Sequence, residues 1–311
     1  MMVVYPSYYE SFRCIADRCR HNCCIGWEID VDEETAARYL AEQGNFGKRL
    51  KSNICYEDGV YSFRLGAKER CPFLGPDNLC DIIKTLGEDA LCEICHLHPR
   101  YRNFYTDREE IGLGLACEEA TRLILSSTAP TVLVSADGIV LPDGGTQEER
   151  EFFRLRDGIF ACLQDRTRPF AERVNRLEKA FSLQLEKYSR AEWVRVFSHL
   201  ECLDPYWKTC LGEIGEEDWL WPQGDLSVPA EQLAFTFVYR HFSKVLEGNS
   251  ASAVISFCLL SVRLIGALWH SMARRFGGVR MEDMVEVARM YSAEIEYSTD
   301  NTDALLVVFE E

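Results

Sequence analysis

The sequence lacks an excess of basic residues. Its 34 Lys and Arg side chains are outnumbered by 50 Asp and Glu, which gives a net charge of −16. Proteins that bind nucleic acid need a basic face to neutralise phosphates, and anionic membrane surfaces likewise attract basic segments. We therefore expect neither nucleic acid nor a membrane among the partners, whereas the charge is compatible with a cationic partner.

The sequence also lacks the marks of export. Residues 1–12, MMVVYPSYYESF, have no basic start, no long apolar core and no small-residue cleavage site, so no signal peptide is predicted. The most apolar run, residues 251–269, contains Arg263 and lies in a helical pattern. It predicts a buried core helix rather than a membrane span. These features predict a cytoplasmic protein, in which thiols stay reduced and disulfides are rare.

Common catalytic motifs are missing as well. The sequence has no P-loop, no Ser/His/Asp signature and no GxGxxG motif after a strand. The nearest approach to a glycine loop is GLGLAC, residues 112–117, and a small-residue packing site explains it equally well. Internal repeats and low-complexity segments are absent too. The chemistry must therefore be sought in a different set of residues.

Cysteine is the residue present in unusual number. The chain has 14 cysteines, and ten of them precede residue 120: Cys14, Cys19, Cys23, Cys24, Cys55, Cys71, Cys80, Cys92, Cys95 and Cys117. The four later cysteines lie at helical positions and are predicted to be small buried hydrophobic side chains.

Three interpretations of this cysteine-rich region compete. Four-thiolate zinc sites stabilise loop-rich regions, iron–sulfur clusters use cysteines at less regular spacing, and buried cysteines also occur without a metal. The density of thiols in a reducing compartment favours a metal over the third interpretation. Spacing alone does not separate zinc from iron–sulfur. A C-x3-C-x2-C motif of the radical type is absent, because Gly26 occupies the position of the third cysteine.

Local spacing indicates which thiols meet. Cys92 and Cys95 are three residues apart and lie on one face of a helical turn. The Gly-Pro-Asp-Asn turn between Cys71 and Cys80 brings these two together. Cys23 and Cys24 are adjacent, so their side chains diverge and they are not expected to be equivalent ligands of one ion.

The pattern changes at LPDGGTQEER, residues 141–150, which contains Pro142, Gly144 and Gly145. We predict a mainly α fold with two domains. Residues 1–145 form an irregular, cysteine-rich, metal-binding region with short strands, and it packs on a helical domain of residues 146–311.

Short elements are predicted within the first region. A helix follows Asp30 or Asp32 as its cap and ends at Gly44. Hairpins turn at Asp58-Gly59 and at Asp137-Gly138. In the second region, apolar stripes at helical spacing predict helices over 152–163, 170–185, 193–200, 229–248, 250–276 and 281–297, and the segment DALLVVFEE closes the chain.

Four segments carry a resemblance to a known family. FRCIADRCRHNCCIGWEIDVDEETAARY, CPFLGPDNLC, ALCEICHLHPRY and LACEEATRLIL resemble the flagellin lysine-N-methylase family, and EIEYSTDNTDAL, residues 294–305, is similar to its C-terminal end. The family shares its cysteine pattern with a broader group described as zinc- or iron-chelating. The resemblance spans most of the chain.

The resemblance implies a methyltransferase that uses S-adenosylmethionine to methylate lysine ε-amines of flagellin. It also implies a cysteine-ligated iron–sulfur centre, of the 4Fe-4S type, with zinc as the alternative. The metal ligands carried over are Cys14, Cys19, Cys23, Cys24, Cys71, Cys80, Cys92 and Cys95, with Cys117 as a further candidate and Cys55 as a spectator. Eight thiolates suit two four-thiolate centres or one cluster with spare thiols.

Methyl transfer to lysine needs a neutral amine. Lysine has a pKa of about 10.4, so only about one part in a few thousand carries a free lone pair at pH 7. The site must desolvate the ammonium or offer a carboxylate or tyrosine as proton acceptor, for which Tyr101, Tyr105, Glu118 and Glu119 are candidates. The sequence assigns no catalytic residue and no S-adenosylmethionine site. Two other functions compete: an iron–sulfur electron-transfer protein and a zinc-stabilised binding scaffold.

Overall fold

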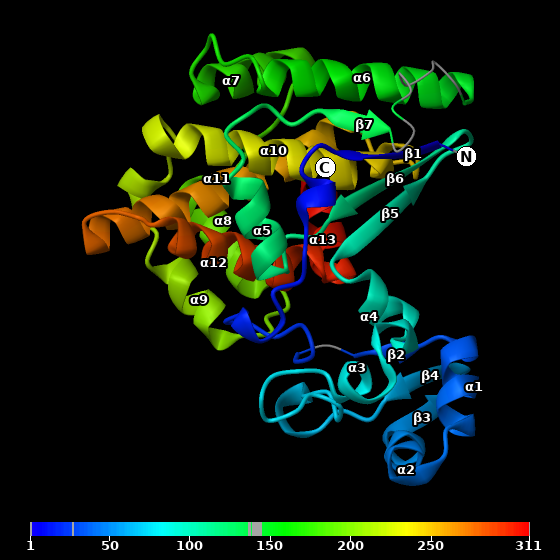
Figure 1. The fold of residues 1–311 in the computed structure, drawn as a ribbon. Helices are drawn as coiled ribbons and strands as arrows, with labels where there is room; N and C mark the ends of the chain where they lie inside the picture. The colour runs from blue at the N-terminus through cyan, green and yellow to red at the C-terminus, as the bar shows by residue number, and fades with distance from the viewer. Residues whose placement is uncertain (1, 27, 136–137, 139–144, 311) are drawn as a thin grey trace. The chain divides into compact units, whose positions relative to one another are not determined.

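The computed structural model describes residues 2–26, 28–135, 138 and 145–310, which fold into two compact units (Figure 1). Unit 1 comprises Met1–Phe12 and Tyr101–Glu311, and unit 2 comprises Arg13–Arg100. These limits differ from the domain boundary predicted at residue 145. Pro142 and Gly144 of the boundary segment lie outside the described residues.

Strand pairing explains why unit 1 takes in both ends of the first region. Its sheet has the strand order β5-β6-β1-β7. Strand β1 pairs in parallel with β6 and antiparallel with β7, so the N-terminal strand is held by segments more than 100 residues further along the chain. The bounds are β1 (Met2–Pro6), β5 (Arg100–Phe104), β6 (Arg108–Leu113) and β7 (Leu133–Ser135). The predicted hairpin at Asp137-Gly138 falls largely outside the described residues.

The rest of unit 1 is helical, as the apolar stripes predict. Its helices are α5 (Glu118–Leu125), α6 (Gln147–Leu163), α7 (Phe170–Phe181), α8 (Arg190–His199), α9 (Pro205–Gly212), α10 (Ser227–His241), α11 (Ala251–Phe276), α12 (Met281–Tyr291) and α13 (Thr299–Glu310). Helix α9 was not predicted, although Asp204 caps it and Pro205 begins it. A mainly helical fold with short strands is confirmed.

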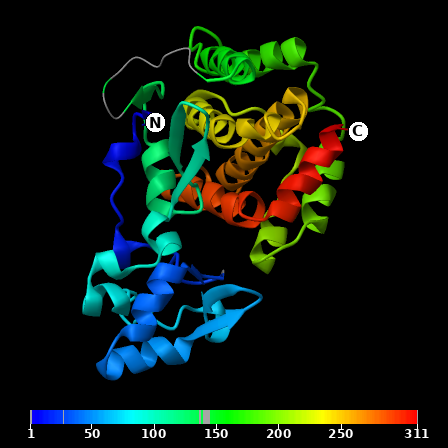
Figure 2. The same ribbon diagram turned by 90° about the vertical axis from the view of Figure 1, so that its right-hand side faces the viewer.

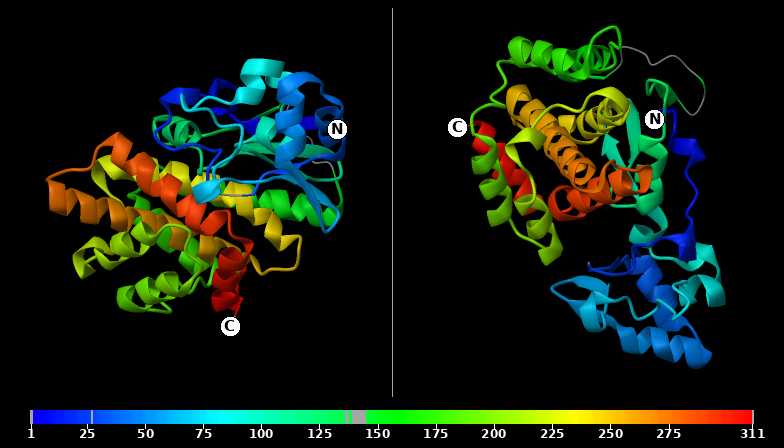
Figure 3. Two further views of the ribbon diagram at one scale, coloured as in Figure 1. Left: turned by 90° about the horizontal axis from the view of Figure 1, so that it is seen from below. Right: turned by 90° about the vertical axis from the view of Figure 1, so that its left-hand side faces the viewer.

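The long apolar helix α11 is a core element of unit 1. Among the described residues it alone is long and apolar enough to cross a membrane, but 89% of its most apolar stretch is buried inside the protein. Helices α10 and α11 lie at the centre of the unit, with α6 and α7 on one flank (Figure 2). Helix α13 packs beside α8, where the rings of Trp193 and Phe309 lie 5.4 Å apart (Figure 3). The predicted buried core helix is confirmed.

Unit 2 contains a small sheet of order β2-β4-β3 and four short helices. Strands β3 (Ile54–Glu57) and β4 (Val60–Phe63) form the hairpin predicted at Asp58-Gly59, and β2 (Asp30–Val31) pairs with β4. Both turn residues have positive φ, 50° for Asp58 and 90° for Gly59, as this two-residue turn requires. The helices are α1 (Glu33–Ala41), α2 (Gly44–Asn53), α3 (Asp81–Leu86) and α4 (Glu93–Leu97).

One local prediction in unit 2 is wrong. Gly44 does not end the first helix, because α1 stops at Ala41 and Gly44 begins α2. The cap of α1 is Asp32 rather than Asp30, since the Asp32 carboxylate accepts a hydrogen bond from the amide of Thr35. Gly44 has a φ of 75°, the left-handed conformation that often follows a helix end, but here it lies at the junction between α1 and α2.

Candidate functional site

The eight cysteines predicted as metal ligands all belong to unit 2, and six of them gather in one place. Cys71 and Cys92 are buried in the small apolar core of the unit, and Cys24, Cys80 and Cys95 pack against it. Cys23 completes the group through its neighbour Cys24. We call these six residues the thiol cluster: Cys23, Cys24, Cys71, Cys80, Cys92 and Cys95.

Backbone pairing joins the first two segments of the thiol cluster. The amide of Cys71 donates to the carbonyl of Cys24 over 2.8 Å, and Ile25 forms an antiparallel bridge with Arg70. The side chain of Asn22 holds this turn by accepting from the amide of Cys24 over 2.9 Å. Residues 47 positions apart in the chain are thereby placed side by side.

The loop between Cys71 and Cys80 closes as its turn residues predict. Leu74 forms an antiparallel bridge with Cys80, and the amide of Gly75 donates to the carbonyl of Leu79 over 2.9 Å. The amide of Asp81 then donates to the carbonyl of Phe73 over 2.8 Å. These bonds return the chain on itself and bring Cys80 back toward Cys71.

The third segment is the start of α4. Cys92 is the residue before the helix and Cys95 lies in its first turn, so the two thiols share a face. Each interacts with the other by a side-chain hydrogen bond, as Cys23 and Cys24 also do, so the prediction that the side chains of these two adjacent residues diverge is wrong. The thiol cluster therefore contains two hydrogen-bonded thiol pairs.

The proton distribution follows from these pairs. The hydrogen bond from Cys24 lowers the pKa of Cys23 to about 7, and that from Cys95 lowers the pKa of Cys92. The donor thiols Cys24 and Cys95 have raised pKa values, because losing the proton would break the bond and place a second negative charge nearby. Burial raises the pKa of Cys71 to about 11 and also raises that of Cys80.

The thiol cluster has the ligand chemistry of a metal site, but its side chains are not arranged as a coordination shell. Several soft sulfur ligands in a partly buried setting are what zinc and iron–sulfur centres use. Within the part of the chain that the structure describes, however, no three His, Cys, Asp or Glu side chains are arranged to hold a metal ion. The structure thus brings the sulfurs into one neighbourhood without the spacing of a closed coordination shell.

The remaining predicted ligands lie outside the thiol cluster. Cys14 is exposed, and its sulfur accepts a hydrogen bond from the amide of Ala16 over 3.4 Å. Cys19 is half-buried and follows a short helical turn. Cys117 belongs to unit 1, where it precedes α5. Cys55 lies on β3 and contacts Ser62 across the hairpin, in keeping with a structural role.

A cavity of about 430 Å³ lies in unit 2 between α4, the start of α1 and the β3–β4 hairpin. Sequence reasoning missed it, because the acidic run DVDEE was interpreted only as the start of a helix. We call it the acidic cavity because four of its ten lining residues are acidic, although most of its lining surface is apolar. The carboxylates are those of Asp30, Asp32, Glu33 and Glu93, and the apolar side chains are those of Val31, Val60, Tyr61, Ile94 and Leu97.

Asp32 connects the lining of the acidic cavity with the segment that carries Cys92 and Cys95. One carboxylate oxygen accepts from the amide of Thr35 in α1, and the other accepts from the amide of Glu93 in α4, both over 2.9 Å. Burial works against the charge, but these hydrogen bonds outweigh it and lower the pKa of Asp32. A single ionised side chain therefore caps two helices, and the second of them begins directly after Cys92.

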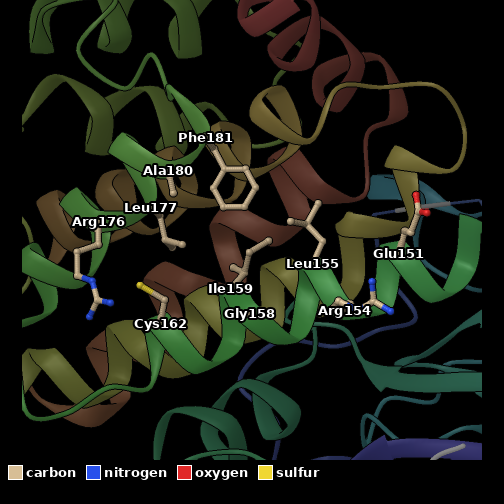
Figure 4. A pocket seen from close by; sticks show the side chains of 10 residues that line it. All are labelled: Glu151, Arg154, Leu155, Gly158, Ile159, Cys162, Arg176, Leu177, Ala180 and Phe181. Atoms are coloured by element: carbon tan, nitrogen blue, oxygen red, sulfur yellow. The ribbon is translucent and has the colours of Figure 1, made fainter. Parts of the chain in front are cut away.

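A second cavity, of about 460 Å³, lies in unit 1 between α6 and α7. Figure 4 shows an apolar floor formed by residues such as Leu155, Ile159 and Phe181, with Arg176 at one end and Arg154 and Glu151 at the other. This lining offers one carboxylate and two guanidinium groups. It lacks the unbalanced negative charge that distinguishes the acidic cavity.

The proton acceptors considered from the sequence belong to unit 1 and fit that role poorly. Burial raises the pKa of both Tyr101 and Tyr105, so both stay protonated at neutral pH. Glu119 accepts two hydrogen bonds from Arg122, over 2.7 and 2.6 Å, which occupy both its oxygens. Glu118 lies beside it in the first turn of α5.

Comparison with known proteins gives a limited but specific result. The chain is 34% identical over 133 residues to the flagellar biosynthetic protein FliU of Salmonella muenchen, a match that covers 40% of this chain and 77% of FliU. It is 33% identical over 133 residues to lysine-N-methylases of Salmonella typhimurium and Salmonella choleraesuis. The match covers only 32% of each methylase, about a third of its length. No family model and no solved structure matches the chain.

Proposed function

Because this chain belongs to the flagellin lysine-N-methylase family, we propose that it transfers methyl groups to lysine ε-amines of flagellin, with S-adenosylmethionine as the methyl donor. The similarity to FliU, which extends over 77% of that protein, is the observation that carries the proposal. The names of the methylase relatives supply the reaction type, and the flagellar name of FliU supplies the substrate.

The reaction sets clear demands on the protein. S-adenosylmethionine supplies a methyl group on a positively charged sulfur. The lysine nitrogen forms a bond to the methyl carbon as the carbon–sulfur bond breaks, which leaves S-adenosylhomocysteine and, after loss of a proton, methyllysine. The protein must remove the proton from the ammonium beforehand and hold nitrogen, carbon and sulfur in line. This two-electron step needs no radical.

We propose further that unit 2 holds an iron–sulfur cluster of the 4Fe-4S type. The ligands come from the eight cysteines predicted from the sequence, and the six of the thiol cluster are the first candidates because they share one neighbourhood. Such a centre would stabilise the cysteine segments and help to hold S-adenosylmethionine. Zinc bound to the same thiols is the alternative.

The test combines the protein, purified without oxygen, with S-adenosylmethionine and flagellin. Mass spectrometry of the flagellin should show gains in steps of one methyl group on lysines, with S-adenosylhomocysteine as coproduct. Unchanged flagellin mass with the metal centre intact would defeat the proposal. Formation of 5′-deoxyadenosine instead would replace the polar transfer with a radical one.

Metal analysis of the same preparation tests the cofactor separately. Iron with sulfide, in a brown protein, is the expected result. Zinc in stoichiometric amount without iron would retain the thiol site but overturn the cluster. A folded protein with no metal at all would overturn both.

A further inference from the structure

We propose that the methionine end of S-adenosylmethionine binds to a buried group of side chains in unit 1, which we call the polar cluster: Tyr101, Arg240, His241, Glu296 and Tyr297. The inference rests on the proposed function for the identity of the methyl donor. It concerns residues of unit 1 alone. Three observations carry it: buried polar atoms without partners, the charges of these atoms, and the backbone that places them.

The first observation is a set of atoms that lack a hydrogen bond. The hydroxyl of Tyr101, the Nη1 atom of Arg240 and the Oε2 atom of Glu296 are buried, and none has a hydrogen-bond partner in the described part of the chain. Nη1 lies 3.6 Å from the other oxygen of Glu296, Oε1, a distance that suits an ion pair but is too long for a hydrogen bond. Buried polar atoms are nearly always hydrogen-bonded. Three unbonded atoms in one cluster therefore indicate a polar group that binds from outside the chain.

The second observation is that these atoms differ in sign. Burial raises the pKa of Tyr101, so its hydroxyl stays protonated and is a donor, as Nη1 of Arg240 is. Oε2 of Glu296 is an acceptor. Burial opposes the charge of Glu296, but Arg240 and His241 outweigh it and lower its pKa, and Nε2 of His241 lies 2.7 Å from Oε1.

This combination of donors and an acceptor narrows the class of ligand. A ligand with only a carboxylate would meet repulsion from Glu296, and one with only an amine would meet repulsion from Arg240. An α-amino acid group carries a carboxylate and an ammonium on the same carbon. Its carboxylate can accept from Tyr101 and Arg240 while its ammonium donates to Glu296. The methionine end of S-adenosylmethionine is such a group.

The third observation is the local backbone. Glu296 ends a π-helical turn, Ser292–Glu296, which follows α12, and turns of this type are rare and frequent at functional sites. The ring of Tyr101 lies against Gly112 of the GLGLAC segment, where a Cβ atom would come within 2.2 Å of the ring carbon Cζ. Glycine at residue 112 thus permits the position of the Tyr101 hydroxyl.

The polar cluster reaches the surface at Tyr297, whose side chain is 47% exposed. The guanidinium carbon of Arg240 lies 4.7 Å from the centre of the Tyr297 ring and 5.1 Å from that of Tyr101. Both rings therefore hold the guanidinium by cation–π contacts, which leave Nη1 without a hydrogen bond. A ligand would enter from the side of Tyr297.

The experiment measures ligand binding to the full-length, anaerobically purified protein by calorimetry. The probes are S-adenosylmethionine, decarboxylated S-adenosylmethionine and 5′-methylthioadenosine, which lacks the whole amino acid group. We expect 5′-methylthioadenosine to bind more weakly than S-adenosylmethionine by a factor of about ten or more, because it leaves all three buried atoms unbonded. Equal affinities of these two probes would overturn the site. Free methionine that binds as tightly as S-adenosylmethionine would overturn the assignment to the methyl donor.

Tyr101→Phe is the most specific variant, since it removes only a hydroxyl without a hydrogen-bond partner in the described chain. It should weaken binding of S-adenosylmethionine by a factor of about ten and leave the affinity for the decarboxylated probe nearly unchanged. Tyr105→Phe is the matched control, because its buried hydroxyl also lacks a hydrogen bond but its ring packs on Phe152 and Phe153. Equal affinities of the two variants for S-adenosylmethionine would contradict the inference. Circular dichroism of each variant confirms that the fold is retained.

Activity measurements separate this inference from the proposed function. If S-adenosylmethionine binds through Tyr101 but flagellin gains no methyl group, the site stands and the methylase proposal fails. If flagellin is methylated and the affinity for S-adenosylmethionine is the same in Tyr101→Phe and the wild type, the methylase proposal stands and the methyl donor binds elsewhere.

Discussion

At the scale of single residues, Asp32 links several parts of unit 2. It caps α1, it caps α4, and it lines the acidic cavity. Aspartate is common at helix starts, so the sequence could predict a cap at residue 30 or 32. The second hydrogen bond, to an amide 61 residues further along, depends on tertiary structure and leaves no local signal.

Replacing Asp32 by alanine should therefore destabilise unit 2 by about 1–2 kcal/mol, since two amides lose their acceptor. Asp30→Ala removes a similar charge that caps no helix and should have a smaller effect. Urea denaturation followed by circular dichroism measures both. Equal destabilisation by the two variants would contradict the double cap.

The contribution of Asp32 should also depend on pH. Its pKa in the folded protein lies below the ordinary value of 3.8, so the folded state favours the ionised form. The stabilisation is fully present above about pH 4, near the unfolded pKa, and is lost as the pH falls through the lower, folded pKa. Unfolding curves of the wild type and Asp32→Ala should converge only in strong acid. A difference that persists unchanged there would argue against the ionised cap.

The thiols give a second prediction at this scale. Cys71→Ser and Cys92→Ser should each lower the iron content of the anaerobically purified protein, because each removes a buried sulfur from the thiol cluster. Cys55→Ser is the matched control, since Cys55 lies in the same unit but faces Ser62 on the hairpin. Iron and sulfide are measured per chain. Equal iron in all three variants would exclude the thiol cluster as the metal site.

At the scale of elements, a buried ion pair joins the sheet of unit 1 to its first long helix. Arg156 on α6 and Glu110 on β6 form two hydrogen bonds of 2.6 Å, and both side chains are almost fully buried. Four aromatic rings lie within 5.5 Å of the guanidinium carbon of Arg156. The charges are thus enclosed by apolar surface, where removing one partner would leave an unpaired buried charge and destabilise the fold.

Arg156→Leu should destabilise unit 1 by about 3–5 kcal/mol, because Glu110 would stay buried without a counter-charge. Adding Glu110→Gln should recover part of that loss. Arg168→Leu breaks the exposed pair with Glu172 and should cost about 1 kcal/mol or less. Guanidinium denaturation provides the comparison, and equal effects of the two arginine variants would contradict this assignment.

Elements whose signals are local could be predicted, and those that depend on distant partners could not. The Asp58-Gly59 turn and the capped helices of unit 1 follow from residue types a few positions apart. The parallel pairing of Val3 with Glu109 joins residues that share no sequence pattern. Likewise, each acidic side chain of the acidic cavity has an ordinary helix-start or strand context, and only folding brings four of them around one hollow.

At the scale of the whole molecule, the two units have different sources of stability. Unit 1 has a large apolar core that includes α10 and α11, whereas the core of unit 2 is small and includes two of its thiols. Small domains often need a metal or crosslinks in addition to their apolar core. Removal of the metal from the anaerobic protein should therefore loosen unit 2 and leave most of the helical signal intact.

Far-ultraviolet circular dichroism and hydrogen exchange before and after chelation test this expectation. Amides of α1–α4 should exchange faster in the chelated protein, while those of α10 and α11 keep their protection. Uniform loss of protection in both units would show that the metal supports the whole chain instead. Unchanged exchange throughout would show that unit 2 needs no metal for its fold.

The pairing of β1 with β6 and β7 also determines an order of assembly on the ribosome. Unit 2 is one continuous stretch, inserted between β1 and the rest of unit 1, so all its segments leave the ribosome before β6 does. The sheet of unit 1 cannot close until synthesis has passed residue 135. The cysteine segments can thus contact one another, and any cofactor delivery system, while β1 is still unpaired.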